Sequence, residues 1–187
     1  MPISNCLFSP TSENPSGFLT IISCKEKPNY KVEINNDEVP ENRFENNVFS
    51  FNYSEDWNIT DSEEIEDGIY YVSVEKNGLD SSGLMTIISF EELIDLDESI
   101  LMNIEQLQDN PVVNNLNFDA TIDSEFNSIK SRSANFNFIT MGIKREGVIY
   151  GFSSKNNSVV ILKQEALEDK NENIEGFETI QNSFEIK

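Results

Sequence analysis

The chain has 187 residues, with 34 Asp and Glu against 13 Lys and Arg, a net charge of −21 and no histidine. This length suits one domain with extensions. Such an acidic surface repels phosphate backbones, so nucleic-acid binding is not expected. The lack of histidine excludes Ser-His-Asp and Cys-His catalytic arrangements and every histidine-based metal site.

Residues 1–23 are expected to be either a lipoprotein leader or a disordered tail. Ile21-Ile22-Ser23-Cys24 resembles a bacterial lipobox, in which the cysteine becomes lipid-modified, and residues 25–29 resemble the polar tether that follows it. The segment departs from the usual pattern because no Lys or Arg precedes Cys24 and the apolar run is short. The alternative is a tail with an incidental cysteine. A disulfide between Cys6 and Cys24 would close a loop outside the predicted domain and add little to its stability.

A polar linker is predicted for residues 24–46, since this stretch carries Pro28 and Pro40 and few aliphatic residues. The folded domain is predicted to span residues 47–187. It opens with a strand at 47–53, whose alternate positions are aromatic. Trp57 follows a turn and is expected at the edge of the core.

Two further strands are predicted at residues 69–74 and 84–90. The acidic stretch before them, 61–68, fails as a calcium loop because Ile65 takes a ligand position. A helix is predicted from Asp95, a suitable N-cap, to Asn110-Pro111. Apolar residues recur along it at helical spacing and define its buried face: Ile100, Leu101, Ile104 and Leu107.

The most regular stretch, residues 134–162, predicts a meander of three antiparallel strands. Its turns are expected at 144–147 and at Asn156-Asn157. Residues 112–119 are interpreted as a connection and 122–130 as a further strand. The final segment is predicted to be a helix capped by Asn173, in which Gly176 costs about 1 kcal/mol relative to alanine. The fold class is therefore α+β: an antiparallel sheet of about six to seven strands flanked by helices.

This order of elements resembles the PsbP-like fold family, which includes bacterial PsbP-related lipoproteins. The resemblance covers residues 47–187. It rests on Phe49-Ser50-Phe51-Asn52-Tyr53 followed by Trp57, on the hairpin, helix and meander above, and on the closing segment from Gly176 to Phe184. Members of this family mostly assemble, stabilise or escort other proteins, so the resemblance implies a protein that is not an enzyme.

The functional expectation is a lipid-anchored bacterial envelope protein that binds or assembles a protein partner. Cys24 is the candidate lipidation residue, and no catalytic, cofactor-binding or metal-binding residue is assigned. Two alternatives stay open. One is a soluble cytoplasmic chaperone or immunity-type binder of the same fold. The other is a hydrolase with two carboxylates, for which Glu91, Glu92 and Asp95 form the nearest cluster, although helix capping also explains these acids.

Overall fold

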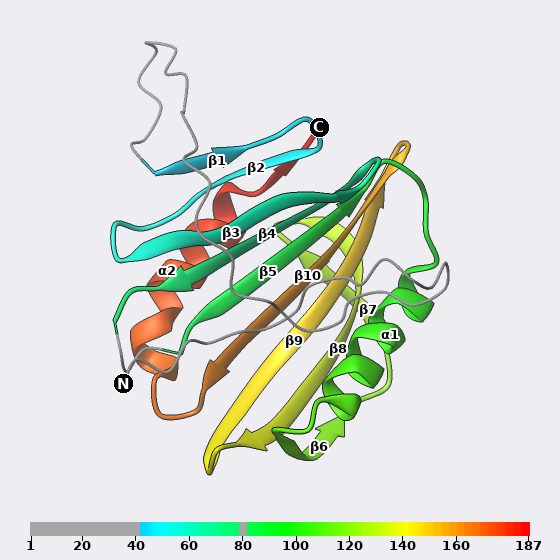
Figure 1. Ribbon diagram of the computed structural model, residues 1–187. Coiled ribbons are helices and arrows are strands. Elements are labelled where there is room, and N and C mark those ends of the chain that lie inside the picture. The colour runs from blue at the N-terminus through cyan, green and yellow to red at the C-terminus, as the bar shows by residue number, and fades with distance from the viewer. Residues whose placement is uncertain (1–41, 79–81) are drawn as a thin grey trace. The chain divides into compact units, whose positions relative to one another are not determined.

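The structure is a computed structural model that describes residues 42–78 and 82–187 (Figure 1). The predicted leader, Cys24 and most of the predicted linker lie outside these residues. The elements are, in chain order, β1 Arg43–Glu45, β2 Phe49–Asn52, β3 Trp57–Glu66, β4 Ile69–Lys76, β5 Leu84–Phe90, α1 Leu96–Asp109, β6 Val113–Phe118, β7 Ile122–Phe126, β8 Ile129–Thr140, β9 Ile143–Ser154, β10 Asn157–Ala166, α2 Lys170–Ser183 and β11 Glu185–Ile186.

Eight antiparallel strands form the main sheet, in the order β3-β4-β5-β10-β9-β8-β6, with β7 also paired to β8. A second sheet joins β1, β2 and β11. The α+β class is confirmed, and the main sheet has one strand more than the upper expectation. The range 24–46 also contains β1, which the sequence analysis placed in the linker. Arg43–Glu45 pair with Ser50–Asn52, so the folded region begins before residue 47.

The two helices pack on opposite faces of the main sheet. Helix α1 lies over Gly151 of β9, where Leu96 and Ile100 would be in contact with an added Cβ. Helix α2 lies over Lys163 of β10, whose ammonium sits 4.4 Å from the centre of the Phe177 ring. Gly151 pairs with Val160 of β10, and Val160 and Lys163 are three positions apart, so they face opposite sides of the strand.

Helix α1 begins as the sequence predicts. The Asp95 carboxylate accepts a hydrogen bond from the Glu98 backbone N–H at 3.0 Å, which confirms the N-cap. The buried face is narrower than predicted, because Ile100, Ile104 and Leu107 are buried whereas Leu101 is 46% exposed.

The second sheet is joined to the main sheet by an aromatic cluster. Phe184, which ends α2, has its ring centre 5.5 Å from that of Phe49 on β2 and 5.7 Å from that of Phe152 on β9. Phe51 and Phe126 complete the cluster, at 6.5 and 5.5 Å from Phe184. All five rings are essentially inaccessible to solvent. The predicted aromatic strand at residues 47–53 therefore supplies core contacts from outside the main sheet.

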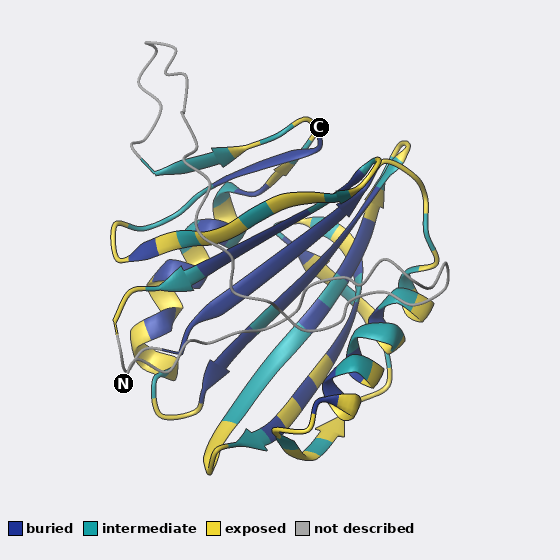
Figure 2. Cartoon of the chain, viewed as in Figure 1, coloured by how far each residue is buried: buried dark blue, intermediate teal, exposed yellow. Residues whose placement is uncertain are grey.

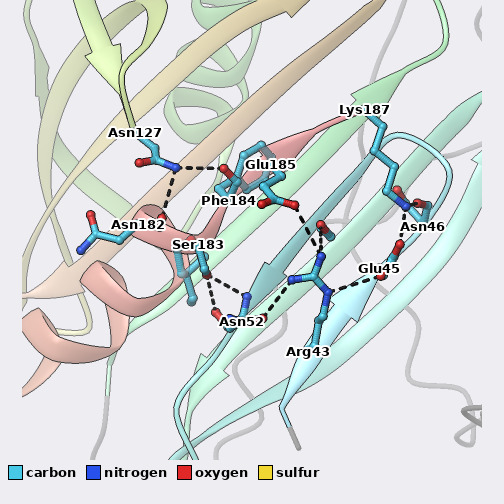
Figure 3. A network of polar contacts seen from close by, with 12 residues as sticks. Arg43, Glu45, Asn46, Asn52, Asn127, Asn182, Ser183, Phe184, Glu185 and Lys187 are labelled. Carbon is cyan, nitrogen blue, oxygen red and sulfur yellow. Dashed lines mark hydrogen bonds and ion pairs between the residues drawn. The ribbon is translucent and has the colours of Figure 1, made fainter. Parts of the chain in front are cut away.

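Polar contacts fix the same region at its surface (Figure 3). The Arg43 guanidinium donates to Asn52 Oδ1 and Ser50 Oγ on the neighbouring strand. Lys187 Nζ donates to the Glu45 carboxylate at 2.7 Å and to the Asn46 carbonyl. These bonds fasten β1 to β2 and join Lys187, the residue after β11, to the end of β1 and the loop that follows it.

The meander from Ala134 to Leu162 is confirmed, but both of its turns lie one to three residues earlier than predicted. The first is Met141-Gly142, and both residues have positive φ, 51° and 83°. A two-residue hairpin turn of type I′ requires that geometry at both positions. Residues 144–147 consequently belong to β9, and residues 145–147 pair with residues 164–166 of β10. The second turn is Lys155-Asn156, with Asn157 already in β10.

Two strands of the main sheet were not predicted. Strand β3 covers the acidic stretch tested as a calcium loop, and β6 covers the asparagine-rich stretch interpreted as a connection. Both lie at the ends of the strand order. Because the side chains of edge strands face water extensively, these segments lack the apolar alternation that identified the central strands.

Trp57 is buried rather than placed at the edge of the core, with 1% of its surface exposed. Its indole lies against Gly176 of α2 on one side and Gly83 on another, where an added Cβ would come within 2.7 Å of Cη2. The Phe177 ring meets the indole edge-on at 4.9 Å between centres. Gly176, which the sequence marks as a destabilising residue in a helix, is therefore the position where a side chain would overlap the Trp57 indole.

Helix α2 begins at Lys170, so Asn173 is not its N-cap. Asn173 is fully buried inside the helix, and its Nδ2 donates to Glu165 Oε2 on β10 at 3.0 Å. Ile174, expected on the apolar face, is 45% exposed. The true start of α2 was not predicted because its first turn is polar and lacks the apolar periodicity from which the helix was identified.

Glu165 should make stability depend on pH. Burial raises the pKa of this carboxyl, while the Asn173 hydrogen bond acts in the opposite direction. A raised pKa in the folded state means that this group stabilises the fold below its ordinary value of 4.5 and that this contribution is lost as the pH rises above it. In the wild type the loss of this contribution lowers the free energy of unfolding between about pH 4 and pH 8. We expect a smaller decrease over the same range in Glu165→Gln, measured by urea titration. The matched variant Glu175→Gln, at an exposed position of α2, should follow the wild-type profile; an unchanged profile for Glu165→Gln would contradict the assignment.

Candidate protein interface

Two edge strands of the main sheet, β3 and β6, are protected against pairing with another strand. Strand β3 carries Asp61, Glu63, Glu64 and Glu66, and its pairing with β4 is interrupted by two irregularities. Charges and bulges on an edge strand oppose strand addition. On β6 the Asn117 side chain donates to the Asn115 carbonyl, and the register with β8 shifts between Asn114 and Asn117. A partner is therefore not expected to extend this sheet at β3 or at β6.

Exposed apolar side chains gather instead at the free end of the β8–β9 hairpin. Met141, in the turn, is 73% exposed, and Ile143 is 40% exposed. Figure 2 shows this hairpin end as exposed. Val112 and Leu167 are 48% and 45% exposed. We call these four side chains the apolar end.

The strand pairing brings the four residues of the apolar end together. Val113 pairs with Thr140, and Thr140 pairs with Ile143, which places Val112 beside the hairpin. The Leu167 backbone N–H donates to the Lys144 carbonyl at 3.0 Å, which places the β10–α2 connection on the other side. Three segments far apart in sequence thus contribute to one end of the sheet. Gathered exposed apolar residues mark interaction sites on soluble proteins.

This surface was not predicted from the sequence. The first hairpin turn was expected at 144–147, which put Met141 inside a strand. The signal that could have located it is Met141-Gly142 between two alternating segments, since a glycine in a two-residue connection is typical of a hairpin turn.

The acids considered for catalysis are not assembled into a site. Glu91 and Glu92 are exposed, and Asp95 is used to cap α1. Within the described ranges, no group of three or more His, Cys, Asp and Glu residues is arranged to hold a metal ion. Cys24, the candidate lipidation residue, lies outside those ranges. Neither described helix is long and apolar enough to span a membrane.

Comparison with solved structures shows the fold. The solution structure of cyanobacterial PsbP from Synechocystis superimposes with a TM-score of 0.59 at 10% sequence identity, covering 83% of this chain and 98% of that one. LpqN of Mycobacterium tuberculosis, described as involved in cell envelope biogenesis, gives a TM-score of 0.49 at 9% identity over 80% of this chain and 87% of its own. No family model and no curated protein sequence matches the chain. The chain has a PsbP-like α+β fold, as predicted.

Proposed function

We propose that this protein is a lipid-anchored, non-enzymatic component of the bacterial envelope that binds a partner protein through its apolar end. The observation that carries the binding role is the exposure of Met141, Ile143, Val112 and Leu167 at one end of the main sheet. Because the β3 and β6 edges are protected against strand addition, contact between exposed side chains is the favoured mode of partner binding. A hydrolase is disfavoured because the candidate acids are exposed or used in capping.

Site-specific crosslinking tests the binding role. A photoreactive amino acid at position 141 should give a discrete adduct in the native host, because this side chain would lie inside the interface. The same group at Lys155, exposed in the turn at the other end of β9, serves as the matched control. Adding Ile143→Asp to the position-141 probe should remove the adduct by placing a charge in an apolar contact. Equal adducts from positions 141 and 155, or none from position 141, would reject the apolar end as the interface.

Anchoring depends on Cys24, and it is tested separately. Multiple acyl chains hold a protein to a bilayer far more firmly than one. In the native host, with the authentic leader, we expect Cys24→Ala to move the protein from the membrane fraction to the soluble fraction and to abolish the acyl mass on the mature chain. Cys6→Ala is the matched control and should leave the distribution unchanged. A wild-type protein that is soluble and unacylated would favour the cytoplasmic binder instead.

A further inference from the structure

The connection that follows β4 begins with an asparagine next to a glycine. Asn77 and Gly78 come directly after Lys76, the last residue of β4, and both are exposed. No other asparagine in the sequence precedes a glycine. Gly78 has a φ of 122°, which glycine adopts readily, and no Cβ crowds its backbone nitrogen. The Asn77 side chain therefore neighbours the least hindered backbone nitrogen that a peptide can present.

Hydrogen bonds hold Asn77 against the beginning of β3. Its backbone N–H donates to the Asp56 carbonyl at 2.7 Å, and its Nδ2 donates to the Glu55 carbonyl at 3.4 Å. Its Oδ1 accepts a hydrogen bond from Nδ2 of Asn58, the second residue of β3. When a nucleophile attacks Cγ of an amide, negative charge develops on the amide oxygen, and a donor at that oxygen stabilises it. Asn58 is thus placed to assist attack on the Asn77 side chain.

We propose that Asn77 is a site of spontaneous deamidation and that Asn58 accelerates the reaction. The backbone nitrogen of Gly78 loses its proton to hydroxide and forms a bond to Cγ of Asn77. The bond from Cγ to Nδ2 then breaks, and Nδ2 takes a proton from water and leaves as ammonia. Water opens the resulting cyclic imide at either of its two carbonyls. The products are aspartate and isoaspartate, and hydroxide and water are the only co-reactants.

Either product weakens the contacts that Asn77 makes with the beginning of β3. A carboxylate cannot donate a hydrogen bond to the Glu55 carbonyl, as Nδ2 of the amide does. The new negative charge lies near the exposed acids Glu55 and Asp56. Isoaspartate also lengthens the backbone just after β4 by one methylene group. Because the buried Trp57 follows Asp56 directly, the modification loosens the segment that leads into the core.

Peptide mapping by mass spectrometry tests the site, with the full chain kept folded in warm, mildly alkaline buffer. The peptide that contains Asn77 should gain the mass of a single deamidation and become a substrate for isoaspartyl methyltransferase. Asn127 is the control within the same sample, because its Nδ2 donates to the Asn182 and Phe184 carbonyls and a serine follows it. The peptide that contains Asn127 should stay unchanged over the same time.

Two variants test the role of Asn58 and the consequence for stability. Asn58→Ala should slow deamidation of Asn77 about tenfold, less than the loss of a buried oxyanion donor in an enzyme, because water replaces an exposed donor. Asn137→Ala, the same replacement at an exposed position of β8, should leave the rate unchanged. Asn77→Asp should melt about 3 °C below the wild type, since it loses the hydrogen bond to Glu55.

The unfolded chain provides the decisive comparison. Urea exposes the same Asn-Gly sequence without the Asn58 hydrogen bond, so Asn77 should deamidate faster in the folded protein than in urea. An Asn77 that stays intact in the folded protein while it converts in urea would overturn the proposal. Equal rates for Asn58→Ala and the wild type would overturn the part assigned to Asn58.

Discussion

Replacing Gly176 with alanine is expected to lower the free energy of unfolding by about 2 kcal/mol or more. In an ordinary helix interior the same change stabilises by about 1 kcal/mol, because glycine is a poor helix former. Here the added methyl would overlap the buried indole of Trp57, coming within 2.7 Å of Cζ2 and closer still to Nε1 and Cε2. Overpacking of this kind costs about 1–3 kcal/mol and occasionally more. Urea unfolding monitored by circular dichroism measures the change.

The control for this prediction is Glu175→Ala, one residue away on the exposed side of α2, which should change stability by less than about 0.5 kcal/mol. A double-mutant cycle gives the cause. In a Trp57→Phe background, which removes part of the indole, Gly176→Ala should cost markedly less than in the wild type. If the single variant Gly176→Ala were more stable than the wild type, the close contact between Trp57 and α2 would be contradicted.

Replacing Phe184 with alanine should cost about 3–5 kcal/mol, as is usual for a buried phenylalanine. Its ring contacts aromatic side chains of both sheets, including Phe49 and Phe152, and is 1% exposed. Loss of the ring would leave a cavity where the two sheets join. Since natural domains have about 5–15 kcal/mol of stability, the melting temperature should fall by about 10 °C or more.

Phe118→Ala is the chemically identical control for Phe184→Ala. Phe118 lies at the end of β6 and is 48% exposed, so its truncation should cost about 1 kcal/mol or less. Similar losses for the two variants would contradict the view that Phe184 joins the sheets. Differential scanning calorimetry of both proteins under one buffer condition makes the comparison.

The sequence predicted the central strands well because their apolar patterns are regular. Strand β10 is almost continuously buried, whereas β8 alternates buried phenylalanines with exposed asparagines. Val159 to Leu162 of β10 and the alternating Phe136 and Phe138 of β8 are all buried, as expected. The N-cap at Asp95 was predictable because it depends on a local side-chain bond to the first turn. The edge strands β3 and β6 were not, since their side chains face water and their strand structure is imposed by the neighbours.

The candidate sites were harder to predict because they depend on contacts distant in sequence. The apolar end is assembled by pairing of β6, β8 and β9, so no single window of sequence contains it. The PsbP-like fold could be anticipated from element order, whereas the apolar end could not.

The bond between Lys187 and Glu45 joins positions 142 apart in the chain. Strand β2 can complete its sheet only after residues 184–187 have left the ribosome, because β11 and Phe184 supply its other neighbours. Until then Phe49 and Phe51 lack the Phe184 ring against which they pack. The second sheet and its aromatic contacts with the main sheet can therefore close only when both ends of the described fold are present.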